Sequence, residues 1–442
     1  MKKKYKKIII GLILIILTVA YTYYVRPIVD DELYNYGFSF NITEGLIPYK
    51  DFNMIITPLF NYLLALILKI FGSKLIVYHV VIAIMLVTIL YMSYEVIGKK
   101  AFVLYILLLL YPYIGYNLFT LCLLFSLFYF EEKNIKRLDI IEPIIISMMF
   151  LTKQTLGILI IPSIIFSKNK KKTIAIYLIS VFTFLLYLII NGSVFQFFDY
   201  CLFGMFEFAN KNSTGLNYLT IIEILIILAL TYFSIKTKRK DIFFCLMFQI
   251  MALPIVNYIH FIISFVPVLY LLFKQFKDNK YLFTISISGL GSFFLAFNFL
   301  VCVGTEGNLK YLEHYKINNF MKGRITYTIT DNYILGSKEI IAKYKNYTPY
   351  IFGRFAYIMK LNHGTRITKY DIINNGNMGY NGADKYIKEI DDYCQKNKCL
   401  FVINDQEDSI SITIQTNMKI LKYVQDNYRG IYNSNLFSVY IN

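Results

Sequence analysis

Apolar segments alternate with short polar stretches along the first 302 residues of the sequence. The longest of these segments reach the roughly 20 residues that a helix needs to cross a lipid bilayer. Inside lipid every backbone polar group must find its partner within the segment, so each segment is expected to be helical. The pattern predicts eleven membrane spans, at residues 8–25, 75–97, 101–116, 118–131, 139–152, 155–167, 173–191, 216–233, 242–257, 260–273 and 281–302.

Two pairs of these spans are short and are joined by tight polar turns. Residues 139–167 turn at LTKQTLG, and residues 242–273 turn at LPIVNYIHF. Irregular backbone at membrane depth is tolerated only where protein buries it or where it lines a cavity. Each turn therefore predicts either a tight helical hairpin or the wall of a cavity that opens outward.

The distribution of charge sets the expected orientation of the spans. Alternate short loops hold 21 Lys and Arg residues, whereas the short loops on the opposite side hold 6. Because basic loops tend to stay in the cytoplasm, the N-terminus is predicted to be cytoplasmic and residue 442 external. Although the net charge is +17, this placement argues against nucleic acid as a partner. The sequence predicts a multi-pass protein of the cell membrane.

Residues 55–71 are the ambiguous segment, because they are apolar enough to insert into the bilayer. If they crossed it, every later basic loop would move to the outside, against the positive-inside rule. They are therefore expected to form a helix on the outer membrane face. The predicted first outer loop covers residues 26–74, within a transmembrane domain of residues 1–302.

Residues 303–442 have shorter apolar runs and many polar residues, which predicts a small external α/β domain. Cys394 and Cys399 fall within it and could form a disulfide or remain free thiols. The expected strands are Tyr350–Phe352, Leu400–Asn404 and Leu436–Tyr440, and the expected helices are Ala383–Gln395 and Ile412–Asn427. The predicted fold is thus a polytopic α-helical membrane domain followed by an α/β domain.

An acidic run follows the first span and is the strongest chemical signal. Asp30, Asp31 and Glu32 lie within a few residues of the expected membrane surface. Crowded carboxylates beside a low-dielectric phase tend to have a raised pKa, which suits proton abstraction from a hydroxyl. The alternative is a solvated acidic cap on a surface helix.

The sequence that follows the acidic run resembles the membrane-embedded GT-C glycosyltransferases. The nearest relatives by motif are the protein O-mannosyltransferases and the lipid A aminoarabinose transferases. The matching residues are Asp31-Glu32, Gly45, Pro48-Tyr49, Asp51-Phe52, Pro58-Leu59 and Phe71-Gly72. The resemblance is specific over residues 1–100, extends in layout to about 302 and does not reach the C-terminal domain. It implies a lipid-phosphate sugar donor, inversion at the anomeric carbon and a first-loop Asp that activates the acceptor hydroxyl.

Carried over by motif, the resemblance assigns the base to Asp31, with Asp30 as the alternative. Glu32, Tyr49 and Asp51 are then expected to bind substrate. One departure concerns the phosphate: the aminoarabinose enzymes have Lys before the Pro-Leu pair, and this chain has Thr57.

Another cation is therefore expected at the donor phosphate. Lys153, with its neighbour Gln154, lies in the first outer turn, and His260 lies in the second. A lysine at membrane depth usually has an anionic partner, although Lys153 could also snorkel to the surface and His260 could bond a carbonyl. His79 is interpreted as structural.

Two acidic residues of a later outer loop, Asp199 and Glu207, could bind an acceptor or face solvent. The sequence contains no convincing set of metal ligands and implies no organic cofactor, so the use of a divalent cation stays open.

The resemblance thus implies a glycosyltransferase that moves a sugar from a polyprenyl-phosphate donor to a glycan, lipid or protein acceptor on the outer membrane face. A transporter or flippase of lipid-linked saccharides is one alternative. Its ionisable groups should lie at mid-membrane, and its sequence should contain an inverted repeat. A non-catalytic envelope scaffold is another.

Overall fold

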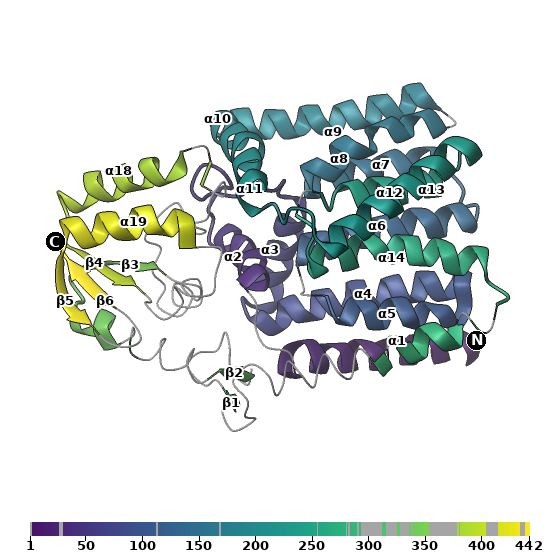
Figure 1. The fold of residues 1–442 in the computed structure, drawn as a ribbon, viewed down its shortest axis with the longest axis horizontal. Helices are drawn as coiled ribbons and strands as arrows, with labels where there is room; N and C mark the ends of the chain where they lie inside the picture. The colour runs from purple at the N-terminus through teal and green to yellow at the C-terminus, as the bar shows by residue number, and fades with distance from the viewer. Residues whose placement is uncertain are drawn as a thin grey trace.

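The computed structural model is a bundle of helices with a small sheet domain beyond one end (Figure 1). It describes residues 2–25, 30–111, 114–167, 169–253, 255–279, 281, 283–289, 291–292, 312–314, 325–327, 336, 339–352, 378–379, 381–403, 414–433 and 438–442. The predicted boundary at residues 302 and 303 lies outside this described part.

The bundle consists of apolar helices that lie roughly side by side (Figure 1). Its helices are α1 (Lys2–Val19, continued by a π-helix, Ala20–Val25), α4 (Leu75–Ile97), α5 (Ala101–Leu109), α6 (Gly115–Glu132), α7 (Leu138–Thr152), α8 (Gln154–Ile160, continued as a 3-10 helix, Ile161–Phe166), α9 (Lys170–Ile190), α12 (Tyr218–Thr237), α13 (Lys240–Ile250) and α14 (Tyr258–Gln275). Among the described residues, three stretches are long and apolar enough to cross a membrane: Leu75–Leu109, Lys170–Ile190 and Tyr218–Thr237.

The helices begin and end close to the predicted spans. The break between α7 and α8 lies at Lys153, and α13 and α14 are separated by residues 251–257. Both breaks fall in the predicted polar turns. The predicted last span, 281–302, is described only in part, and the number of crossings stays a prediction.

Short helices lie between the bundle and the sheet domain (Figure 1). They are α2 (Asp30–Thr43), α3 (Leu59–Phe71), α10 (Val194–Phe198), a π-helix that we call η4 (Asp199–Phe203) and α11 (Gly204–Asn212). The apolar pattern predicts α3, whose buried face includes Phe60, Leu64 and Leu68. It does not predict α2.

The sheet domain contains four strands in the order β3-β4-β6-β5. They are β3 (Thr348–Phe352), β4 (Cys399–Ile403), β5 (Arg429–Asn433) and β6 (Ser438–Ile441), with helices α18 (Gly382–Cys394) and α19 (Ile414–Asn427). β3 and β4 are parallel, whereas β6 is antiparallel to β4 and to β5. A disulfide joins Cys394 to Cys399 and so links α18 to β4. A separate hairpin pairs β1 (Leu312–His314) with β2 (Ile325–Tyr327).

One buried cluster joins the loop between α2 and α3 to the sheet domain. It contains Tyr49 and Phe52 from the loop, Phe197 from α10, and Phe352 and Tyr386 from the sheet domain. Burying a large apolar side chain stabilises a fold by about 1.5–3 kcal/mol. These aromatic contacts therefore hold the sheet domain against the end of the bundle where the site residues gather.

Candidate active site

The acidic run opens α2, and its third residue is part of the core. The Glu32 Oε1 atom lies 2.7 Å from Nε2 of His79, and both side chains are at most 1% exposed. This contact anchors the start of α2 to α4. Asp30 and Asp31 begin the helix, but their carboxyl groups lie outside the described part of the structure.

A tyrosine on α4 extends this anchor to α6. The ring of Tyr36, on α2, packs edge-on against Tyr78, with the ring centroids 6.4 Å apart. The Tyr78 hydroxyl accepts a hydrogen bond of 3.1 Å from the backbone N–H of Gly115, at the start of α6. The first turns of α2 are thereby fixed close to the N-terminal end of α6.

The residues that match the family motif in the loop between α2 and α3 form hydrogen bonds within that loop. Tyr49 has a positive φ of 70°, is fully buried and donates its hydroxyl proton to the carbonyl of Ile56 at 2.6 Å. Burial raises its pKa well above the usual range, so the hydroxyl stays protonated and remains a donor. The Asp51 Oδ2 atom accepts a hydrogen bond of 2.8 Å from the Ile47 N–H. These contacts shape the loop, and substrate binding by Tyr49 and Asp51 stays a prediction.

Thr57 and Gln154 join the loop to the break between α7 and α8. The Thr57 hydroxyl donates to the carbonyl of Phe150 at 2.7 Å, and its N–H donates to Gln154 Oε1 at 3.1 Å. The Gln154 amide donates to the carbonyls of Ile55 at 2.7 Å and Cys201 at 3.3 Å. Gln154 therefore holds three separate segments together, and its contact with substrate stays a prediction.

Lys153 lies in the helix break itself, in extended backbone with φ of −148° and ψ of 99°. Its Nζ atom donates to Asn117 Oδ1 at 2.8 Å and lies 5.4 Å from the centre of the Tyr116 ring. The Asn117 amide in turn donates to the Tyr111 hydroxyl at 2.9 Å. Within the described residues, no carboxylate forms an ion pair with Lys153. Its ammonium is thus held by neutral oxygen and an aromatic face.

His260 lies near Lys153, close enough for the two side chains to interact electrostatically. Asn257 caps α14 by accepting a hydrogen bond of 3.0 Å from the His260 N–H, and its Oδ1 also lies 3.0 Å from Nδ1 of the ring. The two polar turns therefore meet, and the cap fixes the orientation of the imidazole.

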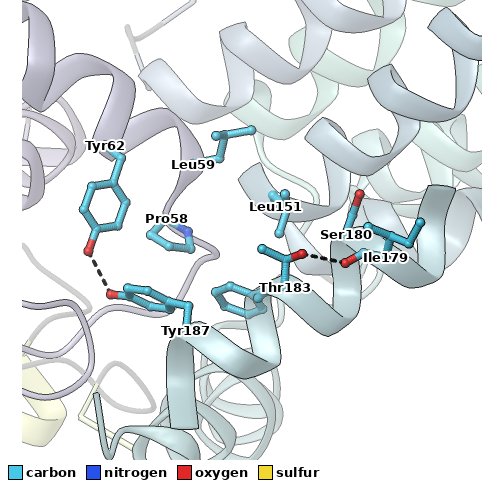
Figure 2. A pocket seen from close by; sticks show the side chains of 9 residues that line it. Pro58, Leu59, Tyr62, Leu151, Ile179, Ser180, Thr183 and Tyr187 are labelled. Carbon is cyan, nitrogen blue, oxygen red and sulfur yellow. Dashed lines mark hydrogen bonds between the residues drawn. The ribbon is translucent and has the colours of Figure 1, made fainter. Parts of the chain in front are cut away.

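An apolar cavity of about 320 Å³ is lined by residues that include the sequence neighbours of Thr57 and the last turn of α7. Figure 2 shows its lining, with the hydroxyls of Tyr62 and Tyr187 directed at one another; their oxygen atoms are 2.8 Å apart. Pro58 lines the cavity directly after Thr57, and Leu151 does so two residues before Lys153. The cavity thus opens beside the helix break, between α3, α7 and α9.

The other candidates have separate roles. Asp199 accepts a hydrogen bond of 2.6 Å from Lys385 on α18 and so contacts the sheet domain. Among the described residues, no group of three or more His, Cys, Asp and Glu side chains could hold a metal ion. Sequence reasoning did not find Asn117, and its only signal is a polar residue just before a predicted span.

Comparison with solved structures identifies the architecture. A crystal structure of ArnT from Cupriavidus metallidurans bound to undecaprenyl phosphate matches with a TM-score of 0.58 and 9% identity, over 99% of this chain and 98% of that chain. The chain has a GT-C-like fold. An apo-form oligosaccharyltransferase of Archaeoglobus fulgidus matches with a TM-score of 0.46 and 12% identity, over 98% of this chain and 74% of that chain. No family model matches the sequence, and no curated protein matches it.

Proposed function

We propose that this protein is a membrane glycosyltransferase that transfers a sugar from a polyprenyl-phosphate donor to an acceptor on the outer membrane face. The observation that carries the proposal is the position of Lys153 in the helix break, held by neutral Asn117 beside His260. The shared GT-C-like fold along nearly the whole chain supports it. The ArnT structure contains undecaprenyl phosphate, a lipid of the proposed donor class.

Asp31 is the proposed base, and Asp30 is the alternative. Asp31 takes the proton of the acceptor hydroxyl, and the acceptor oxygen attacks the anomeric carbon. The bond from that carbon to the phosphate oxygen breaks, and the polyprenyl phosphate leaves with the electron pair. Attack on the face opposite the leaving group inverts the anomeric centre. The Glu32–His79 contact supports this assignment, because it holds the start of α2 in place.

Lys153 and His260 are proposed to meet the donor phosphate. Negative charge grows on the leaving oxygen as the sugar departs, so a fixed cation there stabilises the transition state more than the ground state. Lys153 suits this role because its described partners leave its positive charge unneutralised. Because Nδ1 of His260 is directed at the acceptor oxygen of Asn257, its Nε2 can donate a further hydrogen bond to a phosphate oxygen when the imidazole is protonated.

The cavity of Figure 2 is proposed to take the first isoprene units of the donor lipid. Its lining residues on α9, Ile179, Ser180, Thr183, Phe184 and Tyr187, belong to a helix long and apolar enough to span the membrane. Ile179 is 64% exposed, so lipid can reach the cavity from the side. A polyprenyl chain could then remain in the bilayer while its phosphate reaches Lys153.

The outer-face orientation rests on the basic loops and on the disulfide. Lys7 and Lys133 both contact Glu95, which places two basic segments at the end of the bundle that holds the N-terminus. The sheet domain, with its Cys394–Cys399 disulfide, lies at the opposite end (Figure 1). Disulfides persist in oxidising, extracytoplasmic compartments.

In a variant without reactive native thiols, an impermeant thiol reagent should label cysteines placed at Gly45 and Lys388 but not at Lys170 or Lys238. Labelling at Lys170 would overturn this topology.

The activity is tested with purified protein in lipid vesicles, polyprenyl-phosphate sugars with a labelled sugar, and cell-envelope acceptors. The expected result is label on the acceptor together with free polyprenyl phosphate. If the lipid-linked sugar crosses the bilayer with its glycosyl bond intact, the protein is a transporter. If neither product nor movement is detected with any donor, the catalytic proposal fails.

A further inference from the structure

A second apolar groove, larger than the cavity of Figure 2, lies away from the candidate site, at the end of the bundle that holds the N-terminus. Its volume is about 580 Å³, and residues of α1, α4 and α5, with two from residues 283–289, line it. Figure 1 shows these helices side by side near the N-terminus. Its walls are largely apolar, with Leu14 from α1 and Leu90 from α4.

The mouth of the groove is positively charged. Lys7, Glu95 and Lys99 all line it. Glu95 is the carboxylate there, and it is shared between Lys7 at 2.6 Å and Lys133 at 3.7 Å. Lys99 is exposed and forms no ion pair within the described part of the chain. Two of the three lysines therefore contact the one carboxylate, and a positive charge remains for a ligand.

The groove also has room for a chain of lipid. A Cβ atom added at Gly11 would meet no atom within 4 Å, so the side of α1 that lines the groove is open at this residue. From Lys7 to Leu14 the helix rises about 10 Å, at 1.5 Å for each residue. That length accommodates part of an acyl chain lying in its extended form beside α1.

We infer that this groove is a binding site for an anionic glycerophospholipid. The acyl chain lies along Gly11 and Leu14, and the phosphate headgroup meets Lys99 and Lys7. Basic pockets between transmembrane helices bind such headgroups at the cytoplasmic surface. With the topology proposed above, the groove faces the cytoplasmic leaflet. The lipid is then a structural ligand, separate from any sugar donor at the other end of the bundle.

The absence of Trp from the sequence allows a direct test. A single tryptophan is introduced by Tyr91→Trp, at a groove-lining side chain that is 45% exposed. Tyr232→Trp combined with Lys236→Gln is the matched control, because Tyr232 is 57% exposed, lies outside the groove lining and is a similar distance from the end of its helix. The second change removes the lysine that contacts Tyr232. Full-length protein is placed in phosphatidylcholine vesicles, and quenching is measured with brominated phosphatidylglycerol or brominated phosphatidylcholine.

Quenching of the tryptophan at position 91 should favour phosphatidylglycerol about fivefold, the factor expected for one unneutralised lysine near an anionic headgroup. The control tryptophan should show almost no preference. Adding Lys99→Gln should remove most of the preference, and adding Gly11→Leu should reduce quenching by both lipids. Equal quenching by the two lipids at position 91 would overturn headgroup recognition. No quenching by either lipid would mean that another helix covers the groove, and this too would overturn the proposal.

Discussion

The lysines at the two ends of the bundle have different partners. At the end that holds the N-terminus, Lys240 contacts Glu131 at 2.8 Å and Glu142 at 2.5 Å, and its side chain is only 14% exposed. At the other end, Lys153 contacts neutral Asn117. A lysine between two carboxylates is already neutralised and serves to hold α13 against its neighbours. A lysine held by an amide and a ring retains its charge for an anionic ligand.

The acidic side chains differ in the same way. Glu131 and Glu142 neutralise a lysine, whereas Glu32 is buried against His79 on α4. The last contact orients α2, whose first residues include the proposed base. The comparison therefore separates groups that stabilise the bundle from groups that are proposed to act on a substrate.

Removal of the proposed base should have the largest effect. Asp31→Asn keeps the shape of the side chain but removes its proton affinity, so the transfer rate should fall by roughly 10²–10⁴. Thermal stability should change little. Asp30→Asn is the matched control and should reduce transfer less. A larger loss for Asp30→Asn would move the base to Asp30, and normal transfer by both variants would contradict the enzymatic proposal.

The next effect is expected at Lys153. Lys153→Met keeps the length of the side chain and removes its charge, so transfer should fall by roughly 10–100-fold through loss of transition-state stabilisation. Lys153→Arg should recover part of the rate. Expression and the unfolding temperature should change little, because no described carboxylate loses its partner.

Lys240→Met is the control for the removal of a lysine. It should lower stability and leave transfer unchanged, the opposite of the result expected for Lys153→Met. It leaves Glu131 and Glu142 without their cation, at a cost of about 1–3 kcal/mol in stability. The transfer rate of the protein that remains folded should be close to normal. If Lys153→Met transfers normally, Lys153 is a structural lysine and His260 becomes the residue to test at the phosphate.

The buried contact on α4 should give a smaller effect on transfer and a clear effect on stability. His79→Gln removes the imidazole that contacts a buried carboxyl group, a change that typically costs about 1–3 kcal/mol. Transfer should fall by less than in Asp31→Asn, because α2 is loosened but the base remains. The unfolding temperature and the transfer rate should be measured together. A loss of transfer at unchanged stability would place His79 in the chemistry and contradict the structural interpretation.

The sequence predicts the long elements and the two polar turns because these depend on local patterns. An apolar run of membrane length requires a helix, and the polar turns KQT and VNYIH interrupt such runs at Lys153 and His260. Strands β3 and β4 are short apolar runs and were predicted for the same reason. β5, with the sequence RGIYN, has mostly exposed side chains and offers no such pattern.

The contacts that assemble the site depend on residues far apart in the sequence. Glu32 and His79 are 47 positions apart, and Thr57 and Gln154 are 97 apart. No local pattern indicates such pairs, so the sequence identified Lys153 and Gln154 without showing that one holds a neutral partner and the other joins three segments. α2 mixes aromatic and polar residues without a continuous apolar stripe, which explains why its helix was not predicted.

The smallest effect is expected at a third kind of lysine, which is paired but exposed. Lys385 donates to Asp199 at 2.6 Å, and the two side chains are 47% and 24% exposed. Exposed ion pairs contribute about 0–1 kcal/mol, so Lys385→Ala should barely change the unfolding temperature or the transfer rate.

Gly379 is the sensitive position in the same contact, because an added Cβ would lie too close to Asp199 Oδ2 and the backbone φ of Gly379 is +81°. Gly379→Ala should therefore destabilise the docked sheet domain more than Lys385→Ala does, and Asp199→Ala should relieve part of that cost in the double variant. The three variants are compared by the rate of limited proteolysis of the sheet domain and by the unfolding temperature. If Lys385→Ala alone released the domain, the ion pair rather than the buried aromatic cluster would hold it in place.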